Sequence, residues 1–321
     1  MPIKIQDELP AVAALAAEGV ELIGNSAAFK QDIRPMRIAL LNLMPTKTAT
    51  ELQIARLLGH TPLQIELVLL TTSSYTPKNT SSAHLETFYR TIEDVKGEYF
   101  DGLIITGAPV EQLNFEDVAY WPEFLEIMDW ADAHVLRRLH ICWGAQAGLH
   151  RTFGIAKHRL PKKLSGIYRQ RNLAPDAPLL RGFPAEFPVP VSRHTSVRAA
   201  EVSRHERLRI LAGSRRTGPS IVEDRATGDA FIFDHMEYDT DTLGDEYRRD
   251  SSRGLAPAIP WRYFPGGDIT RQPPNTWRPF GYLFLGTFLQ LLYRDTPYAI
   301  DEVGLARAAL MRRWRSGRVE A

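Results

Sequence analysis

A single cysteine and a histidine close to a glutamate are the residues of this chain best suited to covalent chemistry. Cys142 is the only cysteine among 321 residues, and His235 is followed two positions later by Glu237. A thiolate attacks acyl carbons, an imidazole exchanges protons near neutral pH, and a carboxylate orients the imidazole and stabilises its cation. Together these residue types predict a cysteine nucleophile with a proton-transfer partner. The alternative for Cys142 alone is a small buried apolar residue.

The residues around Cys142 predict a sharp turn between a strand and a helix. The stretch RLHICW (138–143) is apolar enough for a buried strand, and small residues follow it. The next helix would open with Gly144, Ala145, Ala147 and Gly148. Such a turn exposes a nucleophile at the edge of the sheet, and the helix N-terminus favours a thiolate. We expect His140 and His150 to pack beside this turn.

His235 is the best placed of the nine histidines to act as the base. It follows the apolar stretch AFIFD, so we expect it at the carboxyl edge of the sheet, where ligands bind in open α/β folds. Glu237 would then lie on the same side of an extended segment. His194, in the polar stretch VSRHTS, is the competing base. Five others are predicted at the surface: His60, His84, His134, His158 and His205.

Apolar runs alternate with helical patterns through the first half of the chain. Runs at 36–44, 63–72, 100–109 and 138–143 predict buried parallel strands joined by crossover helices. Thr48 and Glu51 have the spacing of a capping box for the first helix, and the next two helices are expected within 81–102 and 122–138. The predicted fold class is therefore α/β, with an open, mostly parallel sheet flanked by helices.

The second half of the chain reads less regularly. Proline and turn-forming residues fill 161–196, which favours irregular structure over the same domain, and an apolar strand returns within 225–239. The apolar segment 280–293 predicts a buried core helix, because it is shorter than the roughly 20 residues that span a bilayer. These patterns divide the chain into three predicted parts. They are an N-terminal extension (1–35), a single α/β domain (36–297) and a C-terminal helix with a basic tail (298–321).

Composition argues against several classes of protein. The chain is 44% hydrophobic, and its 39 basic and 38 acidic residues give a net charge of +1. This balance gives no overall field that would attract nucleic acid or a membrane, so we expect neither as a partner, and a homodimer stays possible. The small-molecule substrates have to be inferred from the site. The N-terminus does not resemble a signal peptide, so a cytoplasmic location is expected. Metal-ligand spacings and phosphate-binding loops are missing from the sequence, so we expect no metal and no permanently bound cofactor.

Six stretches of the sequence, taken in order, resemble one known family. They are NLMPTKTATELQ (42–53), GAPVEQLNFEDVAYW (107–121), CWGAQAGLH (142–150), KLSGIY (163–168), SRHTS (192–196) and HMEYD (235–239). Together they look like the homoserine O-acyltransferases of methionine biosynthesis, from about residue 34 to about residue 297. The resemblance implies a flavodoxin-like fold similar to class I glutamine amidotransferases. It also implies that an acyl group passes from coenzyme A to a cysteine and then to the hydroxyl of homoserine.

The resemblance assigns roles to individual residues. Cys142 would be the acyl-thioester nucleophile, His235 the proton acceptor and Glu237 its partner. The positions that match the substrate-binding residues of the family are Lys163, Ser192 and Arg249. Backbone N–H groups of three further residues would form the oxyanion hole: Trp143, Gly107 and Ala108. The base is flanked by Asp234 and Met236, where many relatives have glycine, proline or another small or apolar residue. We therefore expect Asp234 to alter the charge around the base.

Glu111, in GAPVEQL, is expected to select the acyl donor. In the resembled family, enzymes with glutamate at this position use acetyl-CoA as the donor, and enzymes with glycine there use succinyl-CoA. A carboxylate here would repel the terminal carboxylate of a succinyl group. The sequence therefore predicts a homoserine O-acetyltransferase with acetyl-CoA as co-substrate and L-homoserine as acceptor. The alternatives are succinyl-CoA as donor, serine as acceptor, a glutaminase or glutamine amidotransferase with the same triad, and a non-catalytic binding module.

Overall fold

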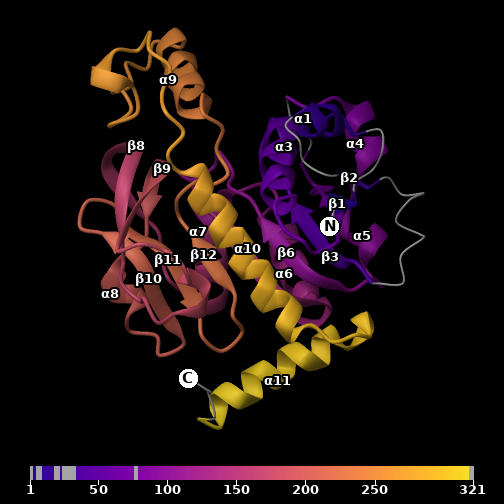
Figure 1. The fold of residues 1–321 in the computed structure, drawn as a ribbon. Helices are drawn as coiled ribbons and strands as arrows, with labels where there is room; N and C mark the ends of the chain where they lie inside the picture. The colour runs from indigo at the N-terminus through magenta and orange to yellow at the C-terminus, as the bar shows by residue number, and fades with distance from the viewer. Residues whose placement is uncertain (1–2, 5–8, 18–21, 24–33, 76–78, 318–321) are drawn as a thin grey trace.

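One mixed sheet of twelve described strands organises the molecule (Figure 1). The computed structural model describes residues 3–4, 9–17, 22–23, 34–75 and 79–317. In spatial order the strands are β2 (Leu22–Ile23), β1 (Ile3–Lys4), β4 (Ile65–Leu70), β3 (Met36–Leu41), β6 (Phe100–Ile105), β7 (Val135–Ile141), β12 (Ala230–Ile232), β11 (Gly218–Asp224), β10 (Leu208–Ser214), β8 (His158–Asn172) and β9 (Glu186–Ser196), with β5 (Tyr89–Arg90) beside β4. Neighbours are parallel from β2 to β12 and antiparallel from β12 to β9.

The α-helices of the described residues flank this sheet. They are α1 (Ala11–Ala17), α3 (Lys47–Leu58), α4 (Ser82–Phe88), α5 (Ile92–Val95), α6 (Trp121–His134), α7 (Trp143–Phe153), α8 (Ala199–Val202), α9 (Thr242–Ser252), α10 (Arg278–Asp295) and α11 (Val303–Arg315). Short 3-10 turns lie at Phe115–Asp117, Pro178–Leu180, Pro265–Gly267 and Ile300–Glu302. The mostly parallel α/β fold class predicted from the sequence is confirmed.

The parallel strands are apolar on both faces because helices cover both. Along β3, Ile38 and Leu40 join the core cluster that includes α10, whereas Ala39 and Leu41 join the cluster that includes α6. Successive side chains of a strand point to opposite faces, so a strand buried on both sides has a continuous apolar run. This explains why the sequence pattern located these strands within a few residues of their ends.

Helix α10 is the buried core helix predicted at 280–293, and it crosses between the parallel and antiparallel parts of the sheet in Figure 1. The predicted C-terminal helix is also present as α11, while residues 318–321 of the basic tail lie outside the described residues. Arg307 of α11 is buried and pairs with Asp229 at 2.7 Å. Helix α11 is thereby attached to the start of β12.

Three local predictions were wrong. The first helix starts at Lys47 with Thr46 as its N-cap, so Thr48 lies inside it and makes no capping box with Glu51. Instead the Glu51 carboxylate accepts hydrogen bonds from Tyr89 at 2.6 Å and contacts His84 at 3.0 Å. A single helix was predicted within 81–102, but the structure has two short helices there, α4 and α5, separated by strand β5. Finally, 161–196 is mainly an antiparallel hairpin of β8 and β9 rather than irregular structure.

The prolines of β9 explain why the hairpin of β8 and β9 was predicted to be irregular. Pro188 and Pro190 pair with Arg169 and Ile167 of β8, and β9 is the last strand of the sheet. An edge strand tolerates proline because a missing N–H on its open side breaks no ladder hydrogen bond. The hairpin extends the sheet beyond β12, and its residues form one wall of the site described next.

Candidate active site

Cys142 occupies a strained turn between β7 and α7. Its backbone has φ 53° and ψ −111°, in a region that L-residues rarely adopt, and its N–H donates to the carbonyl of Ile232 at 2.7 Å. Glycine is required two residues later, at Gly144, because a Cβ there would lie 2.7 Å from the carbonyl oxygen of Thr106. The predicted strand-to-helix elbow is therefore present. Its strain is of the kind that proteins keep at functional positions.

His235 and Glu237 come together as the sequence predicted, although by a different backbone path. The segment after β12 is a bend and turn rather than an extended strand. The His235 Nδ1 lies 2.6 Å from Glu237 Oε1, so the carboxylate holds the imidazole at Nδ1 and leaves Nε2 free of this contact. Tyr238 stacks on the same ring, with centroids 4.1 Å apart. The histidine is thus fixed in orientation by a carboxylate and an aromatic ring.

The pKa of His235 is raised well above its usual value. Burial alone would lower it, because a cation is poorly solvated inside the protein, but the Cys142 thiolate and the Glu237 carboxylate outweigh burial by charge and hydrogen bonding. The imidazole therefore stays protonated near neutral pH.

Gly107 leaves open the space between nucleophile and base. A Cβ at this position would lie 3.7 Å from Cys142 Sγ and 3.8 Å from His235 Cε1. Any larger residue would enter the space that a reacting acyl group needs. Trp143 is the first residue of α7, so its N–H is among those that a helix leaves without an intrahelical acceptor. Gly107 and Ala108 line the cavity beside Cys142, and the oxyanion hole formed by the N–H groups of Gly107, Ala108 and Trp143 stays a prediction.

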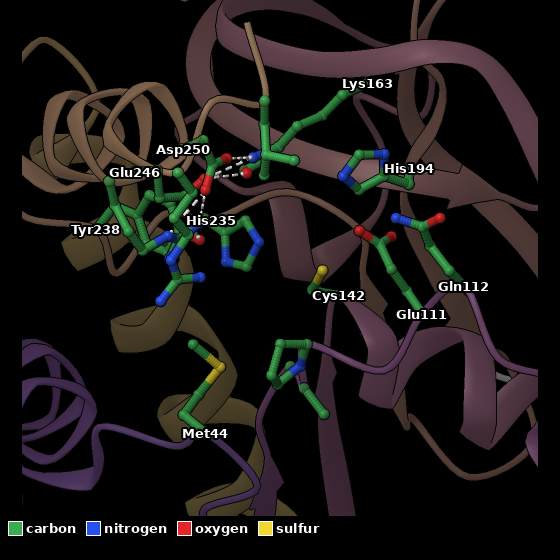
Figure 2. Close-up of a pocket in the computed structure, with 17 residues that line it drawn as sticks. Met44, Glu111, Gln112, Cys142, Lys163, His194, His235, Tyr238, Glu246 and Asp250 are labelled. Atoms are coloured by element: carbon green, nitrogen blue, oxygen red, sulfur yellow. Dashed lines mark hydrogen bonds and ion pairs between the residues drawn. The ribbon is translucent and has the colours of Figure 1, made fainter. Parts of the chain in front are cut away.

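A cavity of about 360 Å³ opens above Cys142 (Figure 2). The residues predicted from the resemblance as substrate contacts, Lys163, Ser192 and Arg249, all line it, and so does Glu111. Figure 2 shows Cys142 at the centre, with His235 on one side and Glu111 on the other. Strand ends that are distant in sequence therefore bring the predicted residues into one cavity.

Glu246 of α9 connects the predicted substrate-binding residues. It accepts hydrogen bonds from Ser192 Oγ at 2.5 Å, from Lys163 Nζ at 3.1 Å and from the Tyr238 hydroxyl at 2.9 Å. Burial alone would raise the pKa of the Glu246 carboxyl, but Lys163 and Ser192 outweigh this effect and hold the pKa below its usual value. An ionised carboxylate therefore lies beside the cavity and could hold a substrate ammonium.

Arg249 lies one helical turn after Glu246. Its side chain is 50% exposed and contacts the Asp250 carboxylate at 2.8 Å, so one of its faces is open to a ligand. Asp250 in turn lies 3.5 Å from Lys163. Residues three and four apart on a helix share a face, which places all three α9 side chains over the same cavity. Carboxylates and cations alternate here, as recognition of an amino acid requires.

The Glu111 carboxylate is held from behind by β9. Its Oε2 accepts from the backbone N–H of Thr195 at 3.2 Å and from the Thr195 hydroxyl at 3.1 Å. The same hydroxyl lies 2.8 Å from Oε1 of the buried Gln146, and Lys157 Nζ donates to the Glu111 carbonyl at 2.8 Å. The loop that carries Glu111 is therefore fixed by side chains of α7, β9 and the α7–β8 connection.

Asp234 does not act on the base as expected. It is fully buried and pairs with Arg193 at 2.6 Å, while Gln170 and Ser220 donate to its other oxygen at 3.0 and 2.5 Å. Its charge is therefore neutralised within the antiparallel part of the sheet rather than at the imidazole. Met236 is a buried core residue.

Three other histidines lie in environments that bear on the choice of base or on the predictions. His194 lines the cavity, but none of the described residues forms a hydrogen bond or ion pair with its side chain. His140 is buried beside the elbow, and burial lowers its pKa to about 3, so it remains neutral. His84 was predicted at the surface but is mostly buried against Glu51. His235 is therefore the histidine whose environment suits a proton-transfer role.

Sequence reasoning missed Glu246, Asp250, Tyr238 and the Thr195–Gln146 support of Glu111. The sequence did indicate Glu246 and Asp250, because 246, 249 and 250 have helical spacing around the predicted Arg249.

Among the described residues we find no cluster of His, Cys, Asp or Glu suited to a metal ion. No helix in the described part of the chain has both the length and the apolar character needed to cross a membrane.

The model of the homoserine O-succinyltransferase family matches residues 2–298. The chain belongs to this family. Similar curated proteins are nevertheless named homoserine O-acetyltransferase. Those of Roseobacter denitrificans and Novosphingobium aromaticivorans are each 49% identical over 95% of this chain and all of their own length, and that of Sinorhizobium fredii is 47% identical over 95% of this chain and 99% of its own length.

A solved structure supports the fold of this family member. A glutamine amidotransferase from Thermotoga maritima aligns with a TM-score of 0.54, covering 81% of this chain and 99% of its own, at 12% sequence identity. This similarity confirms the predicted amidotransferase-like fold.

Replacing Glu237 with Gln should lower the pKa of His235, because the neutral amide removes one of the two negative charges that raise it. The imidazolium would then lose its proton at a lower pH than in the unmodified chain. NMR titration of the His235 ring tests this directly, with Glu201→Gln, which is distant in the fold, as control. An unchanged titration in Glu237→Gln would contradict the assigned role of the carboxylate.

Proposed function

We propose that this chain transfers an acetyl group from acetyl-CoA to the hydroxyl of L-homoserine through a thioester on Cys142. The observation that carries the proposal is a single cavity lined by Cys142, by His235 with Glu237 behind its ring, by the Glu111 carboxylate and by the charged side chains of α9. The family match and the names of the similar proteins support a homoserine acyltransferase. Acetyl-CoA is the co-substrate, and the reaction needs no resident cofactor. The enzyme would act in the cytoplasm on small molecules.

In the first half-reaction the Cys142 thiolate attacks the carbonyl carbon of acetyl-CoA. The negative charge on the carbonyl oxygen would be stabilised by the N–H groups of Trp143, Gly107 and Ala108. The carbon–sulfur bond to coenzyme A then breaks. The departing thiolate takes the proton of His235, which leaves a neutral imidazole and an acetylated Cys142.

In the second half-reaction homoserine occupies the cavity after coenzyme A has left. Its carboxylate would pair with Arg249, and its ammonium with Glu246. The neutral His235 accepts the proton of the hydroxyl as that oxygen attacks the thioester. The bond between the acetyl carbon and Cys142 Sγ breaks, which restores the thiolate and the imidazolium. Glu237 stabilises the imidazolium at both stages.

Glu111 favours acetyl over succinyl for an electrostatic reason. Two like charges about 4 Å apart at an effective dielectric constant of about 20 repel by about 4 kcal/mol. Two buried methylenes contribute only about 0.8 kcal/mol each in the opposite direction. Even with half of the repulsion lost to solvent screening, the carboxylate of succinyl-CoA would be disfavoured beside Glu111. The Thr195 hydrogen bonds keep the Glu111 carboxylate from turning away.

Substitutions at the two candidate bases should have unequal effects. His235→Asn is expected to lose at least about a hundredfold of the transfer rate, because proton transfer contributes that much in comparable enzymes. His194→Asn should retain most of the rate, because His194 has no carboxylate partner among the described residues. Release of coenzyme A thiol in the presence of homoserine measures both. A larger loss of rate in His194→Asn than in His235→Asn would show that His194, on the other wall of the cavity, is the base.

Glu111→Gly should raise the activity with succinyl-CoA relative to acetyl-CoA by at least about tenfold, since it removes both charge and bulk. Glu111→Gln is the matched variant that removes the charge and keeps the size. Competition between the two donors, followed by mass spectrometry of the acylated product, gives the ratio. A preference of the unmodified protein for succinyl-CoA, or an unchanged ratio in Glu111→Gly, would show that Glu111 does not select the donor.

A further inference from the structure

A second hollow, of about 350 Å³, lies along the outer part of β8. Ile167 of β8, Trp261 and the turn between β10 and β11 contribute to it. Five arginines line it: Arg169, Arg171, Arg215, Arg216 and Arg262. Glu186 is the one carboxylate among the residues that line it. The hollow is therefore strongly positive in a chain whose overall charge is nearly balanced.

These five arginines differ from their neighbours in having no acidic partner. None of them forms an ion pair or side-chain hydrogen bond with any residue that the structure describes. Nearby, Arg207 pairs with Asp224, and Arg209 pairs with Asp176 at 2.6 Å. Guanidinium groups gathered without counter-charge repel one another, and an anion bound between them relieves that repulsion. Arginine forks also match the geometry of phosphate oxygens.

An aromatic surface accompanies the charge. The Arg216 guanidinium lies 4.0 Å from the centre of the Trp261 ring, and Trp261 is 41% exposed. Arg262, the next residue, has a positive φ of 51°, which costs backbone energy in a residue that is not glycine. Indole and guanidinium planes are suitable surfaces for stacking a nucleotide base. The hollow thus combines groups that bind phosphate with a group that binds a base.

Strand β8 connects the hollow to the catalytic cavity. Lys163 lines the catalytic cavity and Ile167 lines the hollow, so about 13 Å of strand separates them at about 3.3 Å per residue. Segment 255–261 connects the two places, since Leu255 lines the catalytic cavity and Trp261 hydrogen-bonds beside β8 at Ser165 and Ile167. Leu255 and Ile259 of this segment are 66% and 48% exposed. An exposed apolar track therefore runs between the cavity and the arginines.

We propose that the arginine hollow binds the phosphate groups and adenine of coenzyme A, while the pantetheine arm follows segment 255–261 to place the thioester at Cys142. This inference rests on acetyl-CoA as the donor. Coenzyme A carries a diphosphate and a 3′-phosphate for the arginines, a purine for Trp261 and a largely uncharged arm. The arm is about as long as four extended residues, on the order of 14 Å, which is comparable to the length of β8 between Lys163 at the catalytic cavity and Ile167 at the hollow.

Kinetics with two donors tests the proposal. In Arg215→Gln/Arg216→Gln, the KM for acetyl-CoA should rise about tenfold or more, because two charge-assisted contacts to phosphate are lost. The kcat/KM for S-acetylpantetheine, which has no phosphate, should not change. Arg181→Gln/Arg204→Gln removes two exposed charges outside both hollows and is the matched control. An unchanged KM for acetyl-CoA, or equal losses with both donors, would overturn the proposal.

Binding of adenosine 3′,5′-bisphosphate separates this proposal from the proposed chemistry. Isothermal titration calorimetry should detect binding to Cys142→Ala, which performs no transfer, and binding should weaken about tenfold or more in the double arginine variant. In the unmodified enzyme the compound should compete with acetyl-CoA. Absence of binding, or binding that does not compete with acetyl-CoA, would overturn the site even if acetyl transfer is established. Binding to Cys142→Ala would uphold the site even if the thioester mechanism fails.

Discussion

The protonated imidazole of His235 is the feature on which the rest of the site depends. A buried cation is costly, and this ring is only 4% exposed. It keeps its proton because negative charge lies on both sides, the Cys142 thiolate on one and the Glu237 carboxylate at 2.6 Å on the other. Nucleophile, imidazole and carboxylate therefore have to act as one unit.

The fold supplies this pair by aligning strand ends. Ile232 of β12 lies opposite Ile141 of β7, so the residues that follow the two strands, Cys142 and His235, emerge at the same edge of the sheet. Gly107, just beyond β6, leaves the space between them open. Helix α9 closes the cavity from above, and it is held by a separate apolar cluster that includes Leu243 and Trp277. Catalytic residues thus come from the parallel strands, whereas substrate-binding residues come from β8, β9 and α9.

The sequence predicted the parallel half well because burial on both faces leaves an unmistakable apolar run. It also located the elbow, since Gly144 and Ala145 lie in the first turn of a helix that follows a cysteine at the end of an apolar run. The antiparallel hairpin was missed because Pro188 and Pro190 resemble loop residues, and only their place on the edge strand makes them compatible with a sheet. Thr195 was missed because its role depends on which strand meets the Glu111 loop across the cavity, whereas Glu246 could have been found from its helical spacing to Arg249. The charge of Asp234 was misread because its buried partner, Arg193, belongs to another strand.

Intact-protein mass spectrometry after mixing the chain with acetyl-CoA, without homoserine, tests the central claim most directly. The account predicts a mass increase of one acetyl group, located on Cys142 by peptide mapping and removed when homoserine is added. Cys142→Ala should gain no acetyl group under the same conditions. Rapid turnover with no acetylated protein at any time, or an acetyl group on another residue that homoserine removes, would contradict the thioester mechanism.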